Sequence, residues 1–348
     1  MLGACLAAAA WGAPAYRLAV PKGFPQPKIP PGNPLTADKV RLGRYLFYDK
    51  RMSVNGAGSC GTCHRQELAF TDGRPQAVGA TGQTLPRGTM SLVNVAYAGA
   101  LTWSNPNIHT LEDLALAAMF ATNPLELGVD KQVLVRLIRH DPIYRPLFPR
   151  AFPGEANPYR IANVAKAIAS FVRTIVSRGS AHDRFHFDGD ADAIPESAKR
   201  GEILFFLDYG GPSCFRCHGG FNFSDAVDYV RGPPPPVKLH NNGATRDAGL
   251  FAHTKNPADV GKFKAPTLRN IALTAPYMHD GSIATLGEVV DHYAAGGRMG
   301  HDNPSKDPLV HGFFMTPQNR ADLIAFLESL TDEEVIHDPK FADPWMRE

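Results

Sequence analysis

The feature that most constrains this 348-residue chain is a pair of C-x-x-C-H pentapeptides at residues 60–64 and 214–218. This pattern is the attachment signature of c-type haem, because two thiols three residues apart can add to the two vinyl groups on one haem edge. The imidazole that follows then reaches the iron as its proximal ligand. The sequence therefore predicts two covalently attached haems. The attachment residues are Cys60, Cys63, Cys214 and Cys217, and the proximal ligands are His64 and His218.

Two other arrangements of the four cysteines are chemically possible. They could form a single all-cysteine zinc site, since C-x-x-C pairs bind zinc in many proteins. They could instead form two redox-active or structural disulfides. Neither alternative explains why a histidine follows both pairs, so the haem interpretation is favoured.

The composition and the first 15 residues indicate which class of protein this is and in which cellular compartment it is found. The chain has 36 basic and 34 acidic side chains, a net charge of +2, which does not suit a nucleic-acid-binding protein. The chain contains no run of 18 apolar residues, so no membrane-spanning helix is predicted. Residues 1–15 resemble the end of an export signal, and bacterial c-type haem is attached outside the cytoplasm, so the periplasm is expected. Cys5 is either removed with this signal or carries a lipid anchor.

The pattern of apolar residues predicts a mainly α fold. Residues 16–34 are rich in proline and predict an extended lead-in. Helices are expected after the cap at Thr110, from Asn157-Pro158 until Gly179, from Thr285 through Tyr293, and from Thr316 through Leu330. Strands with alternating polarity are scarce.

An internal repeat surrounds the two pentapeptides. The segments 43–48 (GRYLFY) and 201–206 (GEILFF) precede them, and Phe70-Thr71-Asp72 and Phe223-Ser224-Asp225 follow them. We therefore expect two tandem cytochrome c-type haem domains with long loops. The expected divisions are a signal remnant and lead-in at 1–34, domains at 35–180 and 190–335 and a tail at 336–348, with a linker in 178–196 and a rigid Pro233–Pro236 loop.

The sixth ligand of each iron decides what a haem can do. Residues 65–108 contain no histidine and only one methionine, Met90, so the first haem is expected to be five-coordinate and reactive. The second domain offers several candidates for a sixth ligand. They are Met278, His279, His292, Tyr293, Met299, His301 and Met315.

From about Leu35 to Leu330 the chain resembles bacterial di-haem cytochrome c peroxidases, and more closely MauG and its relatives. The resemblance is most specific in 263–282 (FKAPTLRNIALTAPYMHDGS) and 286–297 (LGEVVDHYAAGG). The peroxidases carry a methionine ligand where this chain has Tyr293, whereas MauG-like enzymes carry tyrosine. The peroxidases also place a distal histidine in the loop matching 77–82, which has none here. A phenolate ligand is a hard anionic donor that lowers the potential of the iron.

The resemblance implies further roles, residue by residue. Trp103 matches the tryptophan that relays electrons between the haems, although a core aromatic is its plainer interpretation. Glu126 matches a distal glutamate that manages peroxide protons, although it could be a solvated carboxylate. Thr274 and Pro276 match backbone ligands of a calcium ion. The asparagine that completes this site in the family corresponds to Gly88, a departure that puts calcium in question.

Residues 86–97 and 217–224 most resemble the methanobactin-associated MauG-like di-haem enzymes (MbnH family). The resemblance implies a periplasmic enzyme that uses H2O2 to reach a bis-Fe(IV)-type state and oxidises a tryptophan on a partner copper-binding protein. One alternative is a di-haem cytochrome c peroxidase that reduces H2O2 with a small donor cytochrome. The other is a non-catalytic electron-transfer cytochrome.

Overall fold

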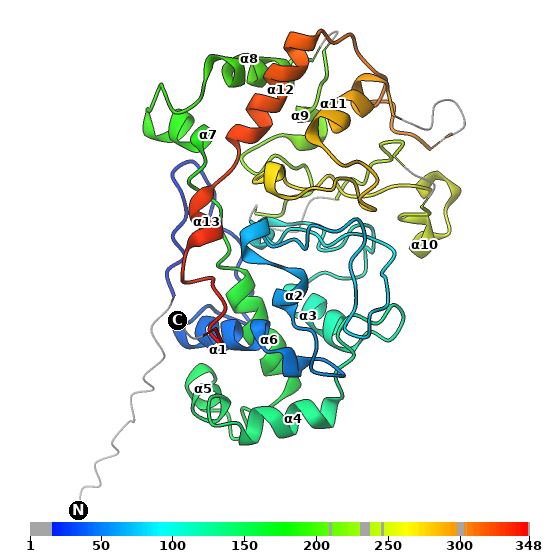
Figure 1. Ribbon diagram of the computed structural model, residues 1–348. Coiled ribbons are helices and arrows are strands. Elements are labelled where there is room, and N and C mark those ends of the chain that lie inside the picture. The colour runs from blue at the N-terminus through cyan, green and yellow to red at the C-terminus, as the bar shows by residue number, and fades with distance from the viewer. Residues whose placement is uncertain are drawn as a thin grey trace, which may run out of the picture.

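The structure is a computed structural model that describes residues 16–208, 211–229, 237–244, 247–297, 303 and 305–346 (Figure 1). Within these ranges the fold is helical, with isolated β-bridges and no extended strand. The helices are α1 (Ala37–Tyr48), α2 (Cys60–Cys63), α3 (Leu111–Phe120), α4 (Lys131–His140), α5 (Tyr144–Ala151), α6 (Ile161–Val172), α7 (Ala181–Asp183), α8 (Glu196–Phe206), α9 (Phe215–His218), α10 (Phe251–Thr254), α11 (Leu286–Ala294), α12 (Pro317–Ser329) and α13 (Glu333–His337). The export-signal segment with Cys5, the Pro233–Pro236 run, Met299 and His301 lie outside the described residues.

Each half of the molecule is built on one pair of crossing helices. Helix α1 crosses α6 in the first bundle, and α8 crosses α12 in the second. A glycine lies at each crossing. A Cβ added at Gly43 would lie 1.9 Å from the carbonyl oxygen of Ala167, and one at Gly201 would lie 1.9 Å from that of Asp322. The two crossings therefore require the absence of a side chain at equivalent positions.

The contacts around the crossings repeat as well. Phe47 packs edge-on against Phe171 at 5.2 Å between ring centroids, and Phe205 contacts Phe326 at 5.0 Å. These rings come from the repeated GRYLFY and GEILFF segments and from the helices that they cross. The mainly α fold with two tandem haem-type domains, which the sequence predicted, is confirmed.

Two asparagines also occupy matching places. Asn94 and Asn270 both have left-handed backbone conformations, with φ values of 57° and 59°. The Oδ1 of Asn94 accepts the backbone N–H of Ser177 at 2.9 Å, and that of Asn270 accepts the N–H of Asp332 at 2.8 Å. In each bundle the asparagine thus ties the loop that follows the haem motif to the segment that follows the last helix.

The expected helices form, with one correction. Thr110 caps α3, Thr285 forms a capping box at the start of α11, and Thr316 caps α12. The expected helix from Asn157-Pro158 to Gly179 is too long at both ends, because α6 begins at Ile161 and ends at Val172. The carbonyl of Ile175 accepts the N–H of Asn94 at 2.9 Å, and this contact requires the chain to leave the helix while Ile175 stays buried.

The segment after α12 returns to the first bundle. Phe341 is buried in the core around α1 and α6, and its carbonyl accepts the hydroxyl of Tyr48 at 2.7 Å. The indole N–H of Trp345 donates to the carbonyl of Tyr45 at 2.9 Å. The last residues are therefore part of the first core, and no pattern in the sequence indicated this.

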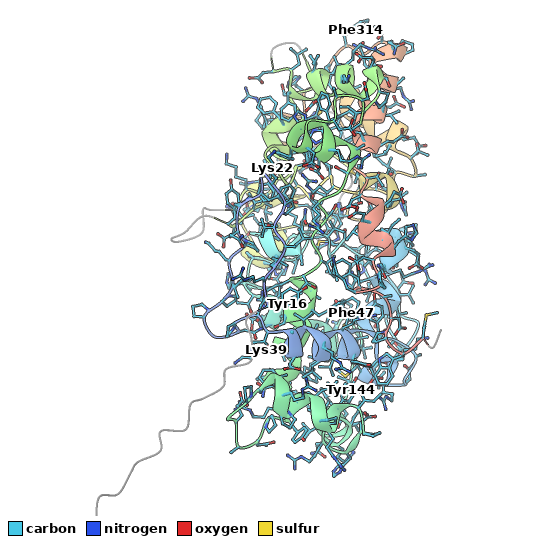
Figure 2. The ribbon with its side chains drawn as sticks, turned by 90° about the vertical axis from the view of Figure 1, so that its left-hand side faces the viewer. Tyr16, Lys22, Lys39, Phe47, Tyr144 and Phe314 are labelled. Atoms are coloured by element: carbon cyan, nitrogen blue, oxygen red, sulfur yellow. The ribbon has the colours of Figure 1, made fainter. Side chains whose placement is uncertain are left out.

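The Pro-rich lead-in runs from Tyr16 beside the first bundle to Lys22 near the second, as Figure 2 shows. Phe24 packs against Phe221 at 4.9 Å and lies under the guanidinium of Arg269 at 4.5 Å. Arg269 is buried and forms an ion pair of 2.8 Å with Asp183. Burial opposes the charge of Asp183, but Arg269 holds the pKa of this carboxyl below its usual value. No helix among the described residues has the length and apolar character to cross a bilayer.

We predict that Gly43→Ala and Gly201→Ala each destabilise the protein by about 1–3 kcal/mol, because the new methyl group overlaps a backbone carbonyl. The sign is opposite to intrinsic helix propensity, which favours alanine over glycine by up to ~1 kcal/mol. Guanidinium unfolding followed by far-UV circular dichroism measures the change. Gly32→Ala is the control, since nothing lies within 4 Å of its Cβ position. Equal stability of all three variants would contradict the crossing geometry.

Candidate haem sites

The first proximal histidine follows helix α2 and is oriented by the loop after it. The Nδ1–H of His64 donates to the carbonyl of Phe70 at 2.9 Å. This bond fixes the tautomer and leaves the Nε2 lone pair for a metal. Burial lowers the pKa of His64, so the ring stays neutral, as an iron ligand must be.

The second proximal histidine repeats this arrangement at the end of α9. The Nδ1–H of His218 faces the carbonyls of Pro266 at 3.1 Å and Phe223 at 3.2 Å. Burial again lowers the pKa of the ring. Phe70 and Phe223, which supply the equivalent carbonyls, both have positive φ angles of 62° and 47°. Bulky residues rarely adopt this conformation, and such positions concentrate at functional sites.

No disulfide joins the four motif cysteines, all of which lie within the described residues. Burial raises the pKa of Cys60 and of Cys214 to about 12, and that of Cys63 to about 11. The pairs lie in separate bundles, and their sulfurs do not gather into one metal-binding group within the described ranges. The geometry therefore fits neither the disulfide nor the single zinc-site alternative, and it fits two separate thioether-linked haems.

A cavity in the second bundle is lined by the residues expected around the second haem. Together with the solvent that opens into it, the cavity encloses about 1360 Å³ of empty space. Cys214, Cys217 and His218 line this cavity, and so does Tyr293 from helix α11. The attachment residues and one candidate sixth ligand thus share a single cavity.

The structure narrows the choice of sixth ligand. Of the candidates that it describes, Met278, His279 and Tyr293 line the cavity, while His292 and Met315 are not among its lining residues. The Tyr293 hydroxyl accepts a hydrogen bond of 3.2 Å from Asn242. Burial raises the pKa of Tyr293 to about 12, against the effect of this bond. A phenolate here therefore requires a neighbouring cation such as ferric iron.

Glu126 lies near the first attachment motif. Its carbonyl accepts the N–H of Ala80 at 2.7 Å, so the loop that lacks a histidine packs against it. Its carboxylate acts electrostatically on the thiols of Cys60 and Cys63 and contributes to their raised pKa values. Burial raises the pKa of Glu126 itself. A carboxyl group with this pKa can exchange protons near the first haem site.

Trp103 lies where the two bundles meet. It lines both the second-bundle cavity and a separate cavity between the bundles. Its indole N–H donates to the carbonyl of Gly88 at 2.9 Å, which fixes the ring plane. His279 contacts the ring at 6.4 Å between centroids and stacks on Phe263 at 3.6 Å. Trp103 is therefore a fixed aromatic group between the sites rather than a residue of one core.

The cavity between the bundles contains the residues expected around calcium. Thr274, Pro276 and Gly88 all line it. A Cβ at Gly88 would lie 2.9 Å from the carbonyl oxygen of Pro75, so this backbone has no space for an asparagine side chain. The buried hydroxyl of Thr89 lines the same cavity and has no hydrogen-bond partner among the described residues. Neutral oxygen donors of this kind suit calcium, which remains a prediction.

One residue of the second cavity was missed by sequence reasoning. The two ring nitrogens of His240 face Asp225 at 2.8 Å and Asp307 at 2.6 Å. The bond to Asp225 is the main reason why the pKa of His240 is raised to about 11. The only signal was Asp225, which belongs to the repeated Phe-Ser-Asp segment. The second cavity therefore has a charged imidazolium in its wall.

Comparison with known proteins agrees with this geometry. The family model of the di-haem cytochrome c peroxidases matches residues 37–192. MauG of Methylorubrum extorquens is 38% identical over 313 residues, 90% of this chain and 83% of the relative. The cytochrome c551 peroxidase of Pseudomonas aeruginosa is 30% identical over 306 residues, 87% of this chain and 81% of the relative.

A solved structure is more similar still. The crystal structure of a MauG-like protein associated with microbial copper homeostasis superposes with a TM-score of 0.91 at 42% identity. It covers 95% of this chain and all of the other. The chain therefore belongs to the family of di-haem cytochrome c peroxidases and MauG proteins, which are peroxide-using haem oxidoreductases.

Proposed function

We propose that this protein is a periplasmic MauG-like enzyme that uses H2O2 to oxidise a tryptophan on a partner copper-binding protein. The observation that carries the proposal is the placement of Tyr293, which lines the same buried cavity as His218. A tyrosine ligand suits a haem that holds an oxidising equivalent, since an anionic donor lowers the potential of the iron. The similarity to a MauG-like protein associated with copper homeostasis supports a partner of this class.

When bound, the two haems supply peroxide cleavage at the first site and storage of oxidising equivalents at both. The chain contributes proton and electron handling. Glu126 accepts and returns a peroxide proton near the first site, where its raised pKa suits the exchange. Trp103 relays electrons between the two haem sites, and its hydrogen bond to the carbonyl of Gly88 holds the indole in place. The substrate tryptophan donates electrons from outside the protein, so this reaction requires no substrate pocket.

One observation favours a second function, that of a peroxidase supplied by a small donor cytochrome. The sulfur of Met278 lies 3.2 Å from the same Asn242 amide that contacts Tyr293, and it lines the same cavity. A methionine ligand raises the potential of a haem and suits it to accept electrons from a carrier. The third candidate, an electron-transfer cytochrome, requires two six-coordinate low-spin haems that do not react with peroxide.

Replacing the proposed ligand tests which function holds. We expect Tyr293→Phe to change the low-spin signal of the second ferric haem in electron paramagnetic resonance, because the phenolate is lost. Tyr277→Phe is the matched control, since Tyr277 is buried in the same cavity but its hydroxyl donates to the carbonyl of Ile271 at 3.2 Å. An unchanged signal in Tyr293→Phe, with a changed one in Met278→Leu, would favour the donor-cytochrome peroxidase.

Removing the proposed proton acceptor tests the first site. We expect Glu126→Gln to slow the reaction of the ferric enzyme with H2O2 by about 10²–10⁴-fold in stopped-flow measurements. The wild-type rate should fall as the pH falls through the pKa of Glu126, which lies above its usual value, because the carboxyl must be ionised to accept a proton. This acidic limb should vanish in the variant. Glu67→Gln, at an exposed carboxylate close to the same motif, should change neither quantity.

The variant Trp103→Phe tests whether this indole carries electrons between the two haem sites. We expect peroxide consumption at the first haem to persist, while oxidation of the second haem slows severalfold because the phenyl ring is harder to oxidise. Rapid-scan absorption of the two haems separates these steps. Trp345→Phe is the control, because this indole packs at the end of the chain against Tyr45 at 5.3 Å. Equal rates in both variants would assign Trp103 to packing alone.

A further inference from the structure

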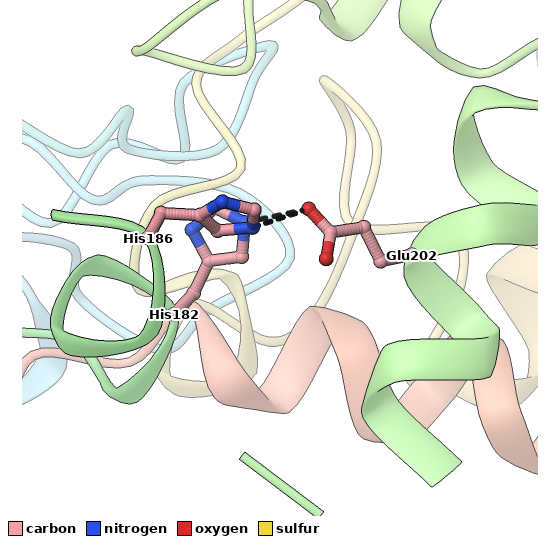
Figure 3. Close-up of side chains that lie close together, drawn as sticks. All are labelled: His182, His186 and Glu202. Carbon is pink, nitrogen blue, oxygen red and sulfur yellow. Dashed lines mark hydrogen bonds and ion pairs between the residues drawn. The ribbon is translucent and has the colours of Figure 1, made fainter. Parts of the chain in front are cut away.

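Two histidines and one carboxylate converge outside the second-bundle cavity and outside the cavity between the bundles. They are His182, His186 and Glu202, shown in Figure 3. Within the described ranges, this is the group of three or more His, Cys, Asp or Glu side chains whose ligand atoms all lie within 4.8 Å of one another. We propose that these three side chains bind a divalent transition-metal ion, with Cu²⁺ held more tightly than Zn²⁺.

The local helix brings the two imidazoles together. His182 and His186 are four residues apart, which places them on one helical face. The chain widens there into a π-helical turn over Arg184–Asp188, and the ring centroids lie 4.3 Å apart. Turns of this kind occur frequently at functional sites. Glu202 approaches from α8, the helix that carries Gly201 at the bundle crossing.

The scaffold beneath the cluster is held firmly. Ser180 caps the turn by accepting the N–H of Asp183 at 3.1 Å. Asp183 in turn forms the buried ion pair with Arg269. His182 packs against Phe223 at 5.3 Å and Phe326 at 5.7 Å. A metal site needs ligands on rigid elements, and these contacts hold the turn that carries His182 and His186 rigidly on the linker side of the second bundle.

The distances fit an ion with small movements. Glu202 Oε1 lies 3.1 Å from His182 Nε2 and 2.7 Å from His186 Nε2. Tetrahedral bonds of about 2.0–2.1 Å place ligand atoms about 3.3 Å apart. Insertion of an ion therefore lengthens these two O···N separations by about 0.2–0.6 Å. The hydrogen on each Nε2 must leave or move to Nδ1, so that the Nε2 lone pairs face the cation.

The donor set selects the class of ion. Two imidazoles with one carboxylate suit Zn²⁺, Cu²⁺ and Ni²⁺ rather than Mg²⁺ or Ca²⁺, which prefer oxygen ligands. For a given site, Cu²⁺ binds more tightly than Zn²⁺.

The burial of the two histidines determines how a metal ion reaches the site and how tightly it binds. The side chain of His182 is 8% exposed and that of His186 is 38% exposed, so an ion enters past His186 and keeps one position open to water. The Nδ1 of His182 is buried and has no hydrogen-bond partner among the described residues. A metal-binding histidine usually donates this N–H to an acceptor, so we expect moderate rather than very tight binding.

Metal retention by the full-length holoprotein, purified without a histidine tag, tests the proposal. The protein is treated with EDTA, desalted, incubated with equimolar CuCl2, ZnCl2 or MgCl2 and desalted again. Inductively coupled plasma mass spectrometry then counts metal per haem iron. We expect one Cu²⁺ or Zn²⁺ for every two irons, and no Mg²⁺. Titration should rank Cu²⁺ above Zn²⁺.

Variants identify the site. His186 is partly exposed, so His186→Gln should fold normally and weaken Zn²⁺ binding by more than the ~10–100-fold that loss of an outer-shell partner costs. Glu202→Gln should also weaken Zn²⁺ binding, because it removes the carboxylate ligand. His337→Gln is the matched control, because this exposed histidine lies 3.8 Å from Glu333 and belongs to no such three-residue group among the described residues. Equal binding by wild type and His186→Gln, or no ion retained by wild type, would overturn the proposal.

Discussion

The close approach of two helices at a glycine is the constraint on which the rest of the molecule depends. At Gly43 and Gly201 the backbone of one helix touches a carbonyl of the other, and the haem motif of each bundle follows a short distance along the chain. In the first bundle the motif packs back on the crossing, since a Cβ at Gly61 would lie 2.3 Å from the ring of Tyr48. The crossing therefore decides where the two thiols and the proximal imidazole can lie.

The two bundles share this frame and differ in what faces the proximal histidine. In the first, a loop without histidine packs against Glu126, a carboxyl group whose pKa burial raises. In the second, helix α11 presents Tyr293 to the cavity, and His240 adds a positive charge to its wall. A duplicated module has thus received two different sets of side chains, which is what the proposed division between peroxide cleavage and charge storage requires.

The sequence predicted those parts of the structure that depend on residues close together in the chain. The haem motifs, the caps at Thr110, Thr285 and Thr316, and the tandem repeat all belong to this class. The early end of α6 was not predictable, because its cause is a hydrogen bond to Asn94, far away in sequence.

The same reason explains why part of the candidate site was missed. His240 owes its charge to Asp225 and Asp307, and the second of these is 67 residues away. Spacing patterns contain no information on such distant partners. Tyr293 was found through resemblance, and the structure adds that it shares a cavity with His218.

The return of the last residues to the first bundle has a consequence for biogenesis. The first core includes Val335, Ile336 and Phe341, so it cannot be completed until these residues have been synthesised. Domains that fold early during synthesis are normally those at the N-terminus. Here the core of the N-terminal module is incomplete until residues 335–341 can pack against it. A chain cut between the two modules would lack part of the first core, so the first module depends on the C-terminal segment for its packing.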